Sequence, residues 1–133
     1  MNKPDIAFRS DIERLIDAFY EKVKADPLIG YIFTEVARVD WPKHLPVMYD
    51  FWEFLLLGGQ AYRGNPIEKH FALHARHPLG AEHFDRWLAL FQETVDELFE
   101  GANADAAKFR AYAISETWKP KFAGGHGVGL PPV

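Results

Sequence analysis

Hydrophobic side chains recur along this chain with helical spacing, and no credible stretch alternates with the two-residue period of a strand. The first such pattern begins at Ser10, which has the spacing of a capping box with Glu13. Its apolar side consists of Ile12, Leu15, Ile16, Phe19, Tyr20 and Val23. Charged residues occupy the opposite side. We therefore predict an amphipathic helix that begins at Ser10 and ends before Pro27.

Two further elements are predicted before residue 60. Leu28–Val36 is apolar and contains Gly30, which indicates a short helix or turn that buries Ile32 and Phe33. The sequence Asp40-Trp41-Pro42 then marks a helix start, since proline is tolerated in a first turn. One face of this helix carries His44, Met48, Phe51, Trp52 and Leu55. The pair Gly58-Gly59 is expected to end it.

A third pattern runs from Asn65 to Phe91 and contains four of the six histidines. Asn65-Pro66 is a helix start, and Ile67, His70, Phe71 and His74 follow at helical spacing. Pro78 interrupts this helix, and a new one is predicted to begin near Gly80. Its apolar stripe consists of Phe84, Trp87, Leu88, Phe91, Val95 and Leu98.

A last helix is predicted after Gly101, with Asn103 or Asp105 as its cap and Pro120 as its end. Its expected inward residues are Phe109, Ala113, Ile114 and Trp118. Residues 1–9 carry little pattern and are interpreted as an arm. Residues 123–133 are rich in glycine and proline with little to bury, so we expect a flexible tail. The predicted fold is all-α, with one domain over residues 10–122.

Composition narrows the function classes. The 133 residues are 48% hydrophobic and 15% aromatic, which is more apolar surface than a small bundle needs and suits a flat apolar cofactor. A net charge of −4 without a basic face argues against nucleic acid. The absence of cysteine excludes thiolate metal sites and cysteine nucleophiles. With neither a signal peptide nor a membrane-spanning run in the pattern, we expect a soluble cytoplasmic protein.

His70 and His74 share an apolar stripe and are therefore predicted to point inward. Such histidines are either hydrogen-bonded at the edge of the core or, as neutral imidazoles, metal ligands. Tyr20 has two similar interpretations, because its ring can pack while its hydroxyl either meets water or lines a site. Local spacing leaves these alternatives open.

Five separated blocks occur in an order that resembles the truncated haemoglobins, and within them the third group. The blocks are FYEKV with Tyr20, DPLIGYIF with Phe33, WPKHLPVMYDFWEF with His44, GNPIEKHFAL with His70 and HFDRWLALF with Trp87. The similarity covers most of residues 10–120, and the glycine-glycine motifs associated with the first two groups are not evident. It implies a two-over-two helical sandwich around one haem b per chain.

The resemblance also implies roles for individual residues. His70, four residues after Pro66, corresponds to the proximal iron ligand, with His74 as the alternative if the gap to Trp87 is counted instead. Three side chains would form the polar lining of the ligand side, namely Tyr20, His44 and Trp87. The apolar neighbours of the porphyrin would be Phe33, Met48, Phe51 and Trp52.

The implied function is binding of dioxygen, nitric oxide or similar small ligands at a five-coordinate haem iron, for oxygen transport or redox chemistry that involves a reductase. Three donors exceed what carriage requires, so nitric oxide dioxygenase or peroxidase-like activity is an alternative. A non-haem metal site built from His70, His74, His77 and His83 is another, although the sequence has no HExxH motif. The third alternative is a helical interaction module with purely structural histidines.

Overall fold

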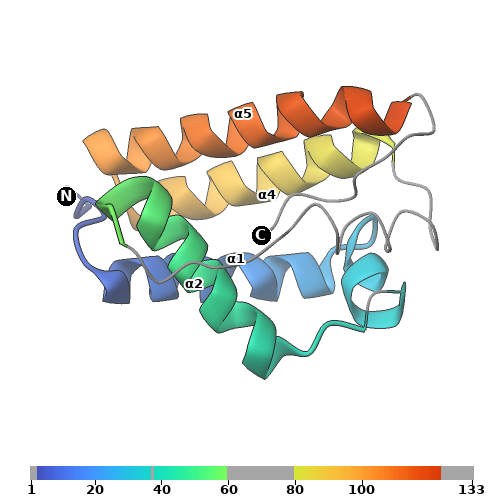
Figure 1. Cartoon of the computed structure of the whole chain (residues 1–133), viewed down its shortest axis with the longest axis horizontal. Helices are drawn as coiled ribbons and strands as arrows, with labels where there is room; N and C mark the ends of the chain where they lie inside the picture. The colour runs from blue at the N-terminus through green and yellow to red at the C-terminus, as the bar shows by residue number, and fades with distance from the viewer. Residues whose placement is uncertain (1–2, 37, 60–79, 124–133) are drawn as a thin grey trace.

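The computed structural model describes residues 3–36, 38–59 and 80–123, and all regular elements in these ranges are helical. They are α1 (Arg9–Ala25), a π-helical turn η1 (Ile32–Val36), α2 (Trp41–Leu57), α4 (Ala81–Leu98) and α5 (Ala102–Ala123) (Figure 1). The helix predicted after Asn65 lies outside the described residues, as do residues 124–133 of the predicted tail.

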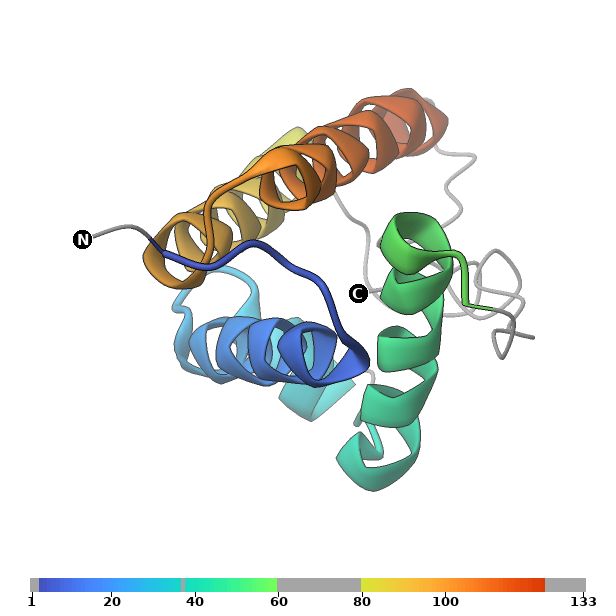
Figure 2. The same ribbon diagram turned by 90° about the vertical axis from the view of Figure 1, so that its left-hand side faces the viewer.

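The four long helices form two pairs. In one pair α2 crosses α1, and in the other α4 and α5 lie side by side and antiparallel (Figures 1 and 2). The pairs are stacked, since α1 packs on α4 and α2 packs on α5. This arrangement confirms the predicted all-α fold with two helices over two.

Helix α1 buries the predicted stripe, but it begins at Arg9 and not at Ser10. The carboxylate of Asp11 accepts hydrogen bonds from the backbone N–H groups of Ala7 (2.9 Å) and Phe8 (3.0 Å). The predicted capping box of Ser10 and Glu13 is therefore wrong. Asp11 accepts from the N–H groups that precede the helix, so Ser10 lies inside the first turn and does not cap it.

The next two elements agree with their predictions. Ile32 and Phe33 are buried in η1. Helix α2 begins directly after Asp40, and Gly58 ends it in the left-handed conformation with φ of 76°, which glycine adopts without a steric penalty.

Helix α4 follows Gly80, whose N–H donates to Nδ1 of His83 at 2.8 Å. His83 thus caps its own helix.

Helix α5 is capped by a residue far away in the sequence. The carboxylate of Asp5 accepts hydrogen bonds from the N–H groups of Asn103 (3.0 Å) and Ala104 (2.8 Å). Gly101, with φ of 135°, lets the carboxylate approach, since a Cβ there would lie 2.5 Å from Cγ of Asp5. The predicted cap at Asn103 or Asp105 is therefore wrong. Through Asp5, the segment before α1 is held against the start of α5.

The inward face of α5 also differs from the prediction. Small side chains are buried there, namely Ala104, Ala107, Ala111 and Ser115, whereas Phe109 is 66% exposed. Small residues let α4 and α5 approach closely, and this packing outweighs the hydrophobicity of one phenylalanine. The helix also continues to Ala123. The predicted end at Pro120 is thus wrong, because a proline loses one backbone hydrogen bond without preventing a further turn.

Candidate functional site

Two polar side chains meet inside the apolar interior between α1 and α2. The Tyr20 hydroxyl of α1 lies 3.1 Å from Nε2 of His44 on α2. Tyr20 is 1% exposed and His44 is half-buried. The interpretation in which the Tyr20 hydroxyl meets water is therefore wrong. The crossing of the two helices instead brings together residues that are 24 positions apart.

Burial reinforces the neutral state of the phenol. A tyrosine hydroxyl is protonated at physiological pH even at its ordinary pKa, and burial raises the pKa of Tyr20 well above that value. The proton of the Tyr20–His44 hydrogen bond belongs to either partner, depending on the imidazole tautomer. The pair can therefore offer one donor to a third group and keep its internal contact.

Aromatic rings enclose this pair. The ring of Trp41 lies 5.0 Å from that of Tyr20 and 5.7 Å from that of His44. Phe33 from η1 adds an edge contact with Tyr20 at 6.1 Å. Phe33 was predicted as an apolar neighbour of the porphyrin, whereas Trp41 was predicted only as part of a helix start. The position of Trp41 three residues before His44, on the same helix face, could have indicated its contact with the site.

The loop before η1 is anchored to α4. The Asp26 carboxylate accepts hydrogen bonds from the N–H groups of Leu28 and Ile29, both at 3.0 Å, and from Nε of Arg86 at 2.6 Å. Burial alone would raise the pKa of Asp26, but the hydrogen bonds outweigh it and the pKa lies below its ordinary value. This anchored loop leads into η1 and so helps to position Phe33.

A second ring cluster joins the two helix pairs. Trp87 is fully buried on α4, stacks with Phe91 at 5.9 Å and meets the edge of Phe19 at 6.0 Å. Phe91 also stacks on Trp52 of α2 at 4.7 Å. Phe19 contacts Tyr20 at 5.1 Å and so links the two clusters. In the described part of the chain, the buried Nε1 of Trp52 has no hydrogen-bond partner.

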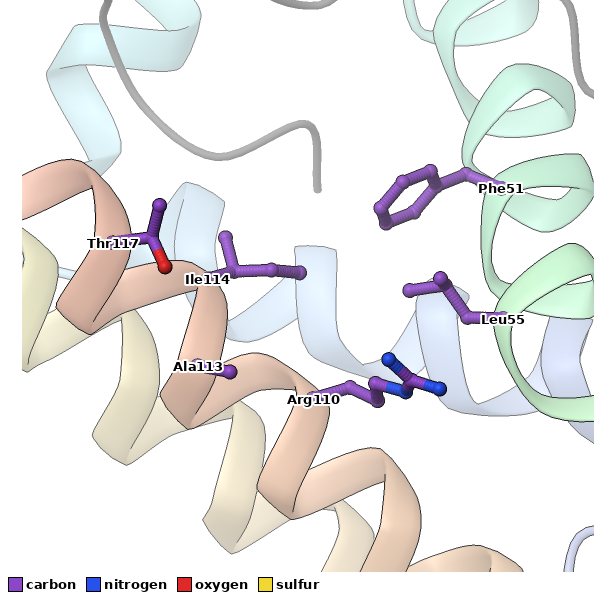
Figure 3. Close-up of a pocket in the computed structure, with 6 residues that line it drawn as sticks. All are labelled: Phe51, Leu55, Arg110, Ala113, Ile114 and Thr117. Carbon is purple, nitrogen blue, oxygen red and sulfur yellow. The ribbon is translucent and has the colours of Figure 1, made fainter.

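A cavity of about 230 Å³ lies between α2 and α5. Phe51 and Leu55 project from α2 toward α5, and Ile114 projects back (Figure 3). The remaining residues that line the cavity are Arg110, Ala113 and Thr117. Met48, the other predicted apolar neighbour, is buried on the same helix as Phe51. The lining is mainly apolar with one cation.

Neither His70 nor His74 lies in the described residues, so the predicted iron ligand has no described position. Within the ranges that are described, no three His, Asp or Glu side chains are grouped to hold a metal ion. No helix there is long and apolar enough to cross a bilayer. The structure thus brings Tyr20, His44 and Phe33 together. Trp87 and Trp52 belong to the second cluster, and Phe51 meets the edge of Trp52 with ring centres 5.6 Å apart.

A two-over-two helical sandwich that holds a buried phenol beside a half-buried imidazole is the arrangement expected of a globin. The family model of the bacterial-like globins matches residues 5–116. The chain belongs to this family, and the family implies a haem cofactor and binding of small ligands.

Within that family, the chain is similar to group 3 truncated hemoglobin ctb of Campylobacter jejuni. The two are 32% identical over 110 residues, which is 80% of this chain and 84% of the relative. The crystal structure of a group III truncated hemoglobin from the same organism superposes with a TM-score of 0.78 at 29% identity and covers 90% of this chain and 94% of the other. The resemblance seen in the five sequence blocks is thereby confirmed.

Proposed function

We propose that this globin binds one haem b per chain, with His70 as the proximal iron ligand, and holds dioxygen or a similar small ligand on the side of Tyr20 and His44. The observation that carries the proposal is the buried Tyr20 hydroxyl, 3.1 Å from Nε2 of the half-buried His44 and in contact with several aromatic rings. Burial of a hydroxyl costs desolvation free energy, and a ligand-binding role would account for keeping it there. We infer a cytoplasmic location.

The residues present fit a haem. A planar apolar macrocycle requires an apolar slot, and the cavity between α2 and α5 is lined by Phe51, Leu55 and Ile114. When bound, haem supplies an iron position for a small diatomic ligand. His70 would hold the iron, and a hydrogen bond from its second nitrogen would orient the imidazole. Trp52, Met48 and Phe33 would pack around the macrocycle.

The ligand side is proposed to work through hydrogen bonds. Tyr20 is protonated at physiological pH, and burial raises its pKa further, so it can donate to an acceptor that carries partial negative charge. Trp87 would contribute an indole N–H, which can only donate. One bond to a charged acceptor contributes about 1.5–3 kcal/mol. At about 1.4 kcal/mol per factor of ten, each donor would slow ligand release about tenfold to a hundredfold.

The same pair supports redox chemistry as a second candidate function. A phenol hydrogen-bonded to an imidazole can deliver a proton to a reduced ligand and be reprotonated through the ring. Simple oxygen transport needs no such relay. Nitric oxide dioxygenase or peroxidase-like turnover with a reductase would use it. Steady-state turnover of nitric oxide or peroxide by the purified holoprotein, compared with its dioxygen affinity, separates the two functions.

Haem retention tests the proposed ligand. We expect His70→Ala to lose haem or to hold it weakly, because no other imidazole would occupy the iron position. His74→Ala is the matched control and should keep the Soret band of the parent. Absorption spectra of the ferric and ferrous forms measure both. Normal haem content in His70→Ala, with loss only in His74→Ala, would transfer the assignment to His74.

Dioxygen release tests the proposed donor. Tyr20→Phe keeps the ring and deletes the hydroxyl, so we expect release to speed up about tenfold or more. Tyr31→Phe makes the same change at a residue that is 41% exposed and should leave the rate unchanged. Stopped-flow displacement of dioxygen by carbon monoxide gives the off-rate. A Tyr20→Phe rate equal to that of the parent would remove Tyr20 from the ligand side.

A further inference from the structure

Trp41 lies at the point where the Tyr20–His44 pair approaches the surface. It is the first residue of α2 and is half-buried. Its ring makes edge contacts with Tyr20, at 5.0 Å and 60°, and with His44, at 5.7 Å and 78°. It also stacks on Phe33 at 6.5 Å and 26°. Trp41 therefore contacts both members of the pair and the ring beside them.

A cation holds Trp41 from another side. The Nζ atom of Lys24 on α1 lies 5.1 Å above the centre of the indole ring. Lys24 is also paired with Glu21 at 2.9 Å. An ammonium over an indole is attracted by the negative face of the ring. Lys24 thus restrains the indole against the buried pair and ties the start of α2 to the end of α1.

His44 has limited freedom as a consequence. The two side chains are three residues apart on α2, so they are neighbours on one face of the helix. The imidazole is in edge contact with the Trp41 ring, so rotation of His44 away from Tyr20 would disturb that contact. The ring of Tyr20, which is 1% exposed, is likewise in contact with the Trp41 ring.

We propose that Trp41 is a positioning residue for the ligand side, which keeps the His44 imidazole on the Tyr20 hydroxyl and closes the pair to solvent. This inference rests on the proposed function, because it concerns the side on which the small ligand would be held. Trp41 does not contact the ligand. It acts by setting the fraction of molecules in which the Tyr20–His44 hydrogen bond is closed.

The test uses the holoprotein in its ferrous carbon monoxide form. The iron–carbon stretching frequency in resonance Raman spectra reports the polarity around the ligand, and the carbon monoxide association rate reports access to it. We expect Trp41→Ala to add a second, less polar band and to raise the association rate about threefold to tenfold, as expected for loss of one aromatic pair. Trp41→Phe keeps a ring and should restore most of the parent behaviour.

Three further variants separate the role of the Trp41 ring from its bulk and from the Lys24 charge. Trp41→Leu retains apolar bulk if Trp41→Ala does not fold, and should show the same second band. Lys24→Met keeps the length of the side chain and removes its charge, so a smaller change in the same direction is expected. Phe109→Ala, at a 66% exposed residue of α5, serves as the control and should match the parent.

The outcomes are separable. If Trp41→Ala and Trp41→Leu lower the unfolding temperature but leave the band and the rate unchanged, Trp41 has a packing role only, and this inference fails while the proposed function stands. A parent chain that shows no Soret band with hemin overturns the proposed function itself.

Discussion

The two helix pairs of this globin are packed by opposite means. Between α1 and α2 lie large rings and polar atoms, with Tyr20 and His44 hydrogen-bonded in the interior. Helix α5, which packs mainly on α4, buries small residues, namely Ala104, Ala107 and Ala111. The side chains of Tyr20 and His44 can change their hydrogen-bond partners without repacking the helices. Alanine side chains have no polar group and no side-chain rotamers to change.

This difference in packing predicts different effects of substitution in the two helix pairs. The α1–α2 pair is also joined at its surface by ion pairs of Arg9 with Asp50 (2.8 Å) and Glu53 (3.2 Å), which contribute little free energy individually. The α4–α5 pair has surface ion pairs too, between Lys108 and Asp96 (2.7 Å) and between Lys119 and Asp85 (2.6 Å). The difference therefore lies in the interior. Substitutions at the Tyr20–His44 contact should change ligand behaviour, whereas those among the small buried residues of α5 should change the free energy of unfolding.

The largest loss of stability is expected where the two pairs meet. Trp52 of α2 is fully buried and stacks on Phe91 of α4. Trp52→Ala should lower the free energy of unfolding by about 3–5 kcal/mol, because it deletes a large ring and leaves a cavity. Urea denaturation measures this loss. A loss near that of the exposed control Phe109→Ala would show that the pairs are not joined at Trp52.

A smaller loss is expected inside the α4–α5 contact. Ala107→Leu inserts a larger side chain at a position that is 0% exposed, and overpacking should cost about 1–3 kcal/mol. Ala89→Leu makes the same change on the exposed face of α4 and should stay within about 0.5 kcal/mol of the parent. Equal stability of the two variants in urea would contradict close packing between α4 and α5.

The smallest effect is expected at the cap of α5, and it depends on pH. Asp5→Ala should cost about 0.5–2 kcal/mol near neutral pH. Burial alone would raise the pKa of Asp5, but hydrogen bonds from the N–H groups of Asn103 and Ala104 lower it below its ordinary value. The stabilisation is therefore present above the ordinary pKa and is lost as the pH falls through the folded-state pKa.

Urea midpoints at two pH values check this sign. The difference between the parent and Asp5→Ala should shrink from pH 7 toward acid. Asp5→Asn retains a cap without charge and should fall between the two at neutral pH. A difference that grows in acid would assign the effect to another group.

The successes and errors of the sequence analysis have different physical causes. The stripes of α1 and α4 were predictable because each is a local pattern of large apolar residues. The cap of α5 was not, because Asp5 lies 98 positions before Asn103. The inward face of α5 was misjudged because alanines signal burial weakly, while Phe109 signals it strongly and lies outside.

The same distinction applies to the site. The five blocks identified Tyr20, His44 and Phe33 as site residues, and the fold brings these three together. Trp41 was missed because its role arises from the crossing of α1 and α2, which no local pattern encodes. His70 and His74 stay predictions.

The cap that Asp5 places on α5 has a further consequence for folding. Asp5 lies 98 positions before Asn103 and 99 before Ala104, so this contact closes a very long loop. During synthesis the segment around Asp5 has no partner until α5 has been made. We therefore expect the final cooperative step of folding to be slow relative to helix formation, and to be sensitive to substitution of Asp5.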